Sequence, residues 1–124
     1  MLFDTSTWIE FFRGNEKGKM VEKFLESQSP IYTSAITIAE LSVWCHKNNL
    51  AFRTHLDLIK RFSNIIDLTE PILEAGGKVY FESRKFNDKI SLIDCIIYAT
   101  ARIHGFLLLT KDGDFRGFDG IEFI

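Results

Sequence analysis

The sequence LFDTSTWIEFF, residues 2–12, decides the fold that we expect for this chain. It begins with two apolar residues, which suit a short buried strand. Asp4-Thr5-Ser6 follows, and residues of these types commonly cap the N-terminus of a helix. From Trp8 to Phe12, apolar residues then recur at helical spacing. The stretch therefore predicts a buried strand that leads directly into an amphipathic helix.

The same order of a strand followed by a helix recurs along the chain. Gly14-Asn15 breaks the first helical pattern, and apolar residues from Met20 to Leu25 predict a second helix. Ile31-Tyr32-Thr33 is strand-like, and Thr37 to Glu40 has the spacing of a capping box before another helix. The remaining expected elements are helices over 50–62 and 70–86, a strand over 64–68, a helix that opens at Ser91 and ends at Gly105, and strands over 106–110 and 121–124.

This alternation predicts an α/β fold with a mainly parallel central sheet that is covered by helices. A length of 124 residues fits one domain, and no linker or repeat divides the chain, so we expect a single domain over residues 1–124. Apolar residues make up 46% and charged residues 26% of the sequence, which excludes a disordered or fibrous protein.

The sequence favours a reducing compartment. No apolar run approaches the roughly 20 residues of a membrane span, and Met1 to Asp4 shows no secretory signal, so the expected location is the cytoplasm. Cys45 and Cys95 lie in apolar helical patterns that suit buried thiols. The net charge of -2 argues against a strongly basic nucleic-acid scaffold. A local basic rim is still possible from Arg13, Lys17, Lys19, Lys85, Lys89, Lys111 and Arg116.

Acidic residues follow the expected strands. Asp4 ends the first strand, Glu40 is expected in the first turn of the helix after the second, and Asp94 in the first turn of the helix opened by Ser91. Asp112 and Asp114 follow the strand over 106–110. Ligands of an open parallel sheet bind beyond the carboxyl ends of its strands. We therefore expect these acids to converge at one edge of the sheet.

Each acid also has a purely structural interpretation. Asp4 suits an N-cap, Glu40 and Asp94 suit capping boxes, and Asp112 and Asp114 suit turn residues. Capping does not require the carboxylates to converge, however. Asp94 is expected in a buried helix, where an unpaired charge is costly unless it binds a cation.

A divalent ion would relieve the repulsion among converging carboxylates. An all-oxygen donor set suits Mg²⁺ or Mn²⁺, whereas Zn²⁺ usually recruits His or Cys, and the sequence has no H-x-x-x-H or C-x-x-C spacing. One or two such ions can activate a water and stabilise the departing oxygen of a phosphodiester.

These segments together resemble the PIN-domain family and, within it, the VapC-type toxins of toxin-antitoxin pairs. The resemblance rests on Asp4-Thr5-Ser6, Ile38 to Leu41, Leu92 to Asp94 continuing to Ala101, and Leu109 to Phe115. It implies an Mg²⁺- or Mn²⁺-dependent endoribonuclease, a homodimer, and a small antitoxin with a DNA-binding domain as partner. It also implies site residues, namely Asp4, Glu40, Asp94 and Asp112 as catalytic metal ligands, with Thr5, Ser6, Thr110 and Asp114 as auxiliary groups.

Three other functions stay open at this point. An Asp at the end of the first strand also suits a different Mg²⁺-dependent phosphohydrolase, although Ser6 stands where such enzymes usually carry a second Asp. A phosphoacceptor receiver domain would use strand-end acids and a lysine near Lys111, but it usually has two acids at the first strand. The third alternative is a PIN-like domain that only binds, which the intact acidic set disfavours.

Overall fold

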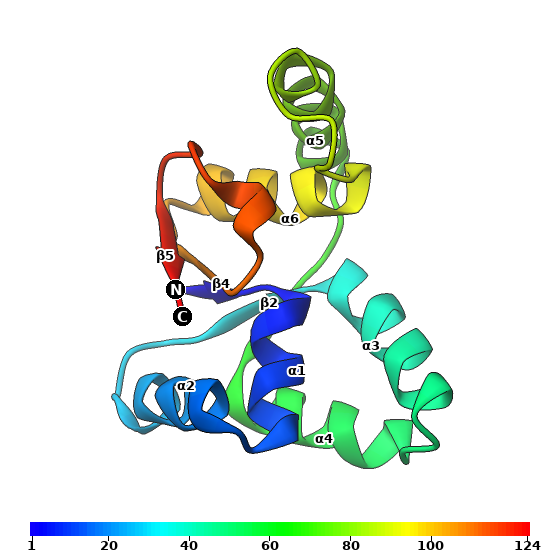
Figure 1. Cartoon of the computed structure of the whole chain (residues 1–124), viewed down its shortest axis with the longest axis vertical. Coiled ribbons are helices and arrows are strands. Elements are labelled where there is room, and N and C mark those ends of the chain that lie inside the picture. The colour runs from blue at the N-terminus through cyan, green and yellow to red at the C-terminus, as the bar shows by residue number, and fades with distance from the viewer.

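Five short strands form one parallel sheet in the computed structural model, which describes all residues 1–124 (Figure 1). Their order across the sheet is β3-β2-β1-β4-β5, so β1 lies in the centre. Every neighbouring pair is parallel. The strands are β1 (Leu2–Phe3), β2 (Tyr32–Ser34), β3 (Asn64–Ile66), β4 (Leu108–Thr110) and β5 (Ile121–Phe123).

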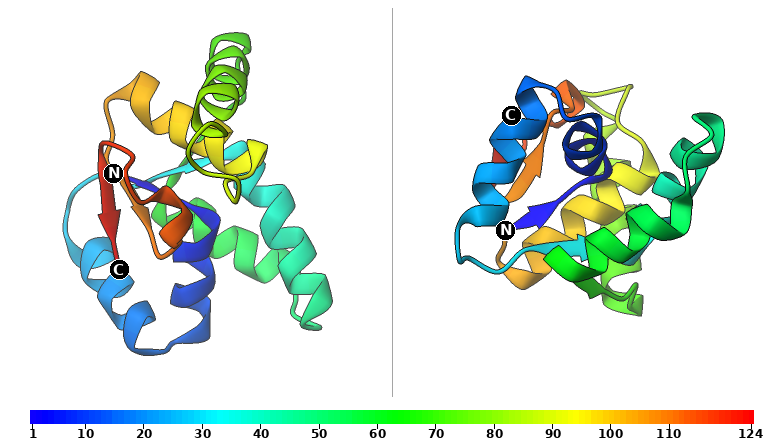
Figure 2. Two further views of the ribbon diagram at one scale, coloured as in Figure 1. Left: turned by 45° about the horizontal axis from the view of Figure 1, so that its top comes forward. Right: turned by 90° about the horizontal axis from the view of Figure 1, so that it is seen from below.

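Helices cover both faces of this sheet, as the two further views show (Figure 2). The α5 and α6 helices pack against each other, and α1 packs against α2 (Figure 1). The predicted fold class, a parallel sheet covered by helices, is confirmed. The helices are α1 (Thr5–Arg13), α2 (Glu16–Glu26), α3 (Ala35–Lys47), α4 (Phe52–Phe62), α5 (Glu70–Ser83), α6 (Leu92–His104) and the short 3-10 helix η1 (Gly113–Phe115).

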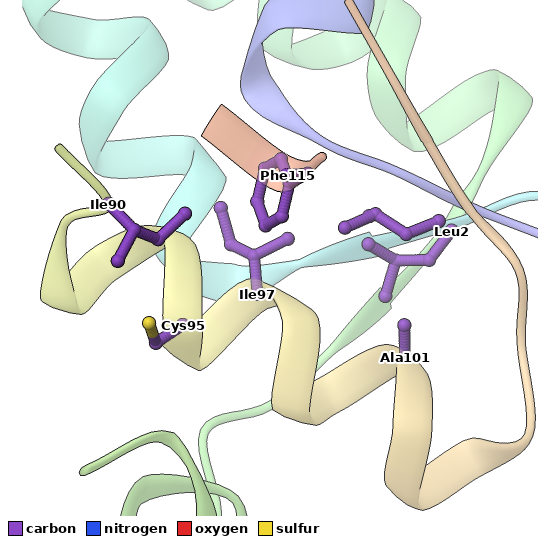
Figure 3. Close-up of a cluster of buried hydrophobic side chains, with 7 residues drawn as sticks. Leu2, Ile90, Cys95, Ile97, Ala101 and Phe115 are labelled. Atoms are coloured by element: carbon purple, nitrogen blue, oxygen red, sulfur yellow. The ribbon is translucent and has the colours of Figure 1, made fainter. Parts of the chain in front are cut away.

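The two residues of β1 enter different hydrophobic clusters, because successive side chains of a strand point to opposite faces. Leu2 packs in a cluster with α6 residues such as Ile97 and Ala101 (Figure 3). Phe3 packs in a second cluster with Trp8 of α1. The core on both sides therefore holds β1 and the residue that follows it, Asp4, in a fixed place.

Several predicted elements are shorter than the sequence patterns indicate. The α5 helix ends at Ser83, so Phe86 lies beyond it, and β4 begins only at Leu108. Hydrophobic residues beyond the end of a helix or strand can extend its apolar sequence pattern, although they no longer make the backbone hydrogen bonds that define the element. The segment between β4 and β5 contains η1.

The predicted capping box at Thr37 and Glu40 is wrong. The α3 helix begins three residues earlier than that box requires, and its N-cap is Ser34, whose Oγ accepts from the Ile36 N–H at 3.4 Å. The last residue of β2 caps α3 directly, without an intervening loop. Glu40 consequently lies in the second turn of α3, so its carboxylate has no capping role.

The burial of the two cysteines agrees with the expectation from the sequence. Both cysteines are free and buried. No helix combines the length and the apolar character that a membrane span requires.

Candidate active site

The topology brings the predicted acids to one edge of the sheet. The neighbours of β1 are β2 on one side and β4 on the other, so the order of the strands reverses at β1. Ligand sites of open parallel sheets form at such a switch point, beyond the carboxyl ends of the strands. Asp4 follows β1 there, Asp112 follows β4, and Glu40 lies on α3, which follows β2.

Asp4 is the most enclosed of these acids, with only 3% of its surface exposed. It is the N-cap of α1, and its Oδ1 accepts from the Thr7 N–H at 2.8 Å and the Ser6 hydroxyl at 2.7 Å. Its Oδ2 accepts from the Thr110 hydroxyl at 2.5 Å. Burial raises the pKa of Asp4, although these donors counteract the shift by stabilising the ionised form.

Glu40 is half-buried and lies close to two other acids. Its Oε1 accepts from the Thr5 hydroxyl at 2.5 Å. Burial raises the pKa of Glu40, and the negative charges of Asp94 and Asp4 raise it further against the effect of the Thr5 hydrogen bond. Glu40 therefore lies within electrostatic reach of acids from two other segments.

Asp94 completes the capping box of α6 with Ser91, as predicted, and the helix is largely buried from Cys95 onward, but Asp94 itself is half-buried. Its N–H donates to Ser91 Oγ at 3.0 Å, and its Oδ2 accepts from the Ser91 N–H at 3.3 Å. The first turn of α6 points partly to solvent, as the 48% exposure of Leu92 shows. Burial raises the pKa of Asp94, opposed by Ser91 and reinforced by the charges of Asp112 and Asp114.

The capping roles of Asp112 and Asp94 are real, but they do not compete with a role at the site. Asp112 Oδ1 accepts from the Asp114 N–H at 2.9 Å and so caps η1. In each case one carboxylate oxygen makes the capping bond, and the other accepts no hydrogen bond from the chain. Both carboxylates therefore keep an oxygen that is available to a ligand.

Hydroxyl groups connect the strand ends at this edge. Ser6 Oγ lies 3.2 Å from Thr110 Oγ1, and the Asp112 N–H donates to Thr110 Oγ1 at 2.9 Å. Thr7 belongs to the same network and was missed by the sequence analysis. Its hydroxyl lies 3.0 Å from Asp4 Oδ1 and 2.6 Å from the Leu109 carbonyl oxygen. Its position three residues after an N-cap Asp is the sequence signal that could have identified it.

No cation of the chain neutralises these acids. The two salt bridges of the structure both involve Glu10, which pairs with Arg13 and Lys111. An all-carboxylate donor set without a countercharge fits a hard divalent cation such as Mg²⁺ or Mn²⁺. The structure contains no group of three or more carboxylate, imidazole or thiol side chains already arranged to hold an ion. The donors thus share one edge without forming a finished ligand shell.

The comparisons with known proteins agree with this architecture. The model of the PIN domain family matches residues 1–121. A chain of a toxin-antitoxin complex from Klebsiella pneumoniae is 32% identical, with a TM-score of 0.75, over 98% of this chain and 94% of that chain. FitAcB from Neisseria gonorrhoeae is 28% identical, with a TM-score of 0.77, over 99% of this chain and 96% of that chain.

A third similar structure is VapC20 from Mycobacterium tuberculosis, a sarcin-ricin loop cleaving toxin. It shares 20% identity and a TM-score of 0.77 over 98% of this chain and 96% of that chain, which is a likeness of fold. No curated protein sequence matches the chain. The family model nevertheless spans nearly the whole sequence, which confirms the resemblance, and the chain belongs to the PIN-domain family.

Proposed function

We propose that the chain is a divalent-metal-dependent endoribonuclease, the VapC-type toxin of a toxin-antitoxin pair. The observation that carries this proposal is the set of acids from four segments at the switch point of the sheet, none of which has a cationic partner. The 32% identity to a chain of a toxin-antitoxin complex supports the toxin assignment. The proposed nuclease domain spans residues 1–124, and a cytoplasmic location fits an RNA substrate.

In this proposal Asp4, Glu40, Asp94 and Asp112 hold Mg²⁺ or Mn²⁺. A bound divalent ion supplies an activated water and neutralises the charge that develops on the phosphodiester. The hydroxyls of Ser6 and Thr110 orient the Asp4 carboxylate, to which both donate. Thr5 does the same for Glu40, and Asp114 adds negative charge beside Asp94.

RNA is the proposed substrate because VapC20, which has the same fold, cleaves the sarcin-ricin loop. The alternative functions are another Mg²⁺-dependent phosphohydrolase and a phosphoacceptor receiver-like domain. Both alternatives need an Asp that accepts a phosphoryl group from a small donor. Here Ser6 stands two positions after Asp4, where a phosphohydrolase of this kind usually carries its second Asp, and the first strand is followed by one acid, whereas a receiver domain usually has two.

Incubation with labelled RNA and, separately, with acetyl phosphate tests this proposal. Each incubation is done with Mn²⁺ and with a chelator. Strand cleavage that depends on Mn²⁺, without phosphorylation of the protein, is the expected result. Phosphorylation without cleavage would select the receiver-like alternative.

We expect the chain to form a homodimer. Large apolar side chains lie at the surface of α3 and α4, where Val43 is 55% exposed and Phe62 is 41% exposed, whereas Leu41 is buried in the core. A domain of this size does not usually expose so many apolar residues without covering them. Light scattering should give a mass of about twice the 14.3 kDa chain. A monomer at all micromolar concentrations contradicts the expectation.

We also expect inhibition by a small antitoxin that carries a DNA-binding domain. Carboxylates without a cationic partner are suited to bind an arginine guanidinium bidentately. A cationic segment of the partner that enters the acidic edge would therefore displace the divalent ion. Deletion of that segment from the co-purified partner should weaken its inhibition of RNA cleavage. Equal inhibition by the shortened partner contradicts the mechanism.

A further inference from the structure

Glu10 is a buried carboxylate that the proposed mechanism does not use. It lies on α1 with 2% of its surface exposed. Arg13 Nη1 donates to its Oε1 at 3.0 Å, and both Asn15 Nδ2 and Lys111 Nζ also donate to its carboxylate. Burial acts to raise the pKa of Glu10, but the three donors outweigh it and hold the pKa below its usual value. Glu10 is therefore ionised at neutral pH.

The contact with Lys111 is the long-range one of the three. Lys111 immediately precedes Asp112 in the loop after β4. Its N–H donates to Ser6 Oγ at 3.1 Å, while its ammonium reaches Glu10. Ser6 and Glu10 are four residues apart on one face of α1, about 6 Å along its axis, and the four-carbon lysine arm spans that distance. Lys111 therefore lies along α1, with its backbone N–H bound to Ser6 and its ammonium bound to Glu10.

This arrangement takes a positive charge away from the acids. Glu10 is six residues from Asp4, roughly 9 Å along the axis of α1. Lys111 is the residue before Asp112, and its side chain is flexible. Without Glu10, the Lys111 ammonium would be free to move toward the acids, which form no salt bridge with any other cation of the chain. An ammonium there competes with a divalent ion for the same oxygens.

We propose that Glu10 is a positioning residue, which holds the Lys111 ammonium on α1 and so keeps the acidic edge free for a divalent ion. The inference rests on the proposed metal-dependent function. Neither Glu10 nor Lys111 is one of the proposed metal ligands, so the role of their ion pair is to control the charge near the site.

Binding of Mn²⁺ alone, in the absence of RNA, tests the inference. Glu10→Gln keeps the shape of the side chain but releases the ammonium, and it should weaken Mn²⁺ binding about tenfold, the usual lower range for groups beyond the ligands themselves. Adding Lys111→Met removes the competing charge, so the double variant should return to within about twofold of the wild-type affinity. A purely structural ion pair would instead leave the double variant at least as impaired as the single one.

Arg13→Gln is the matched control. It removes the other cation from Glu10, and the Arg13 side chain is 49% exposed, but Lys111 stays in place. This variant should bind Mn²⁺ with the wild-type affinity. An unchanged affinity in Glu10→Gln, or a double variant as weak as the single one, overturns the inference.

If Glu10→Gln does not fold, Lys111→Met alone decides. Because the ammonium is held away from the acids, its removal should leave the affinity for Mn²⁺ within about twofold of the wild-type value. A larger change in the affinity for Mn²⁺ overturns the inference. A wild-type chain that binds Mn²⁺ but cuts no RNA refutes the proposed function alone. A wild-type chain that cuts RNA, with a Glu10→Gln variant that binds Mn²⁺ normally, refutes this inference alone.

Discussion

Replacing Asp4 by asparagine is expected to slow RNA cleavage roughly a thousandfold or more, equivalent to about 4 kcal/mol in the activation barrier. The substitution removes the negative charge at the centre of the acidic edge but keeps an oxygen that accepts from the Thr7 N–H, since Asn is as good an N-cap as Asp. The metal-free variant should melt at the same temperature as the wild type or higher, because the repulsion between Asp4 and Glu40 is relieved. Cleavage of labelled RNA and thermal melts measure the two effects.

Asp94→Asn distinguishes the two roles of a capping carboxylate most sharply. If Asp94 only caps α6, the variant should keep its activity and nearly all of its stability, because Asn retains an oxygen that can accept from the Ser91 N–H. If Asp94 is a metal ligand, activity disappears and the metal-free stability stays equal or rises. Asp112→Asn should behave in the same way, and so should Glu40→Gln, whose carboxylate has no cap to lose.

Asp57→Asn serves as the control, because Asp57 is an exposed residue on α4 outside the acidic edge. It should change neither activity nor stability. An Asp94→Asn variant that cuts RNA at near wild-type rate would remove Asp94 from the proposed ligand set.

Mn²⁺ is expected to stabilise the folded wild-type chain strongly. At a concentration one hundred times its dissociation constant, a ligand that binds only the folded state adds about 2.7 kcal/mol to the free energy of unfolding, roughly 10 °C in melting temperature. The acid-to-amide variants should gain much less. Calorimetry with and without Mn²⁺ measures the difference, and an equal gain in wild type and Asp4→Asn contradicts the proposed site.

The same acids determine how stability depends on pH when no metal is present. Folding raises the pKa values of Asp4, Glu40 and Asp94. At a pH between the ordinary and the raised pKa values, the folded chain therefore binds more protons than the unfolded chain. This contribution to stability is complete below the ordinary values near 4 and is lost as pH rises through the raised values. The metal-free melting temperature should therefore be higher near pH 5 than near pH 7.

Two comparisons check the assignment of this pH effect. Asp4→Asn should reduce the dependence of the metal-free melting temperature on pH. With Mn²⁺ present, acidification should instead lower the melting temperature, because protons compete with the ion for the carboxylates. A metal-free melting temperature that responds to pH equally in wild type and Asp4→Asn contradicts the assignment. Glu10 does not disturb the comparison, since its pKa is lowered and it titrates below this window.

The sequence by itself determined the order of the elements and the edge at which the acids gather. Alternation of apolar strands with amphipathic helices is a local pattern, and strands that are joined by helices favour a parallel arrangement. The position of Asp4 at the end of β1 follows from residues 2–12 alone. The caps at Asp4 and Ser91 were predictable for the same reason, because their hydrogen bonds join residues three positions apart.

Only the tertiary structure decided which of these acids is buried and what holds the loop after β4. Asp4 is buried beside Thr110, which lies 106 positions away in the sequence and donates a hydrogen bond to its carboxylate. Asp94 is only half-buried, although apolar residues flank it in the sequence. The ion pair of Glu10 with Lys111 likewise joins residues 101 positions apart. Periodicity shows which face of a segment is apolar, but burial and ion pairing depend on the neighbours that the packed sheet brings together.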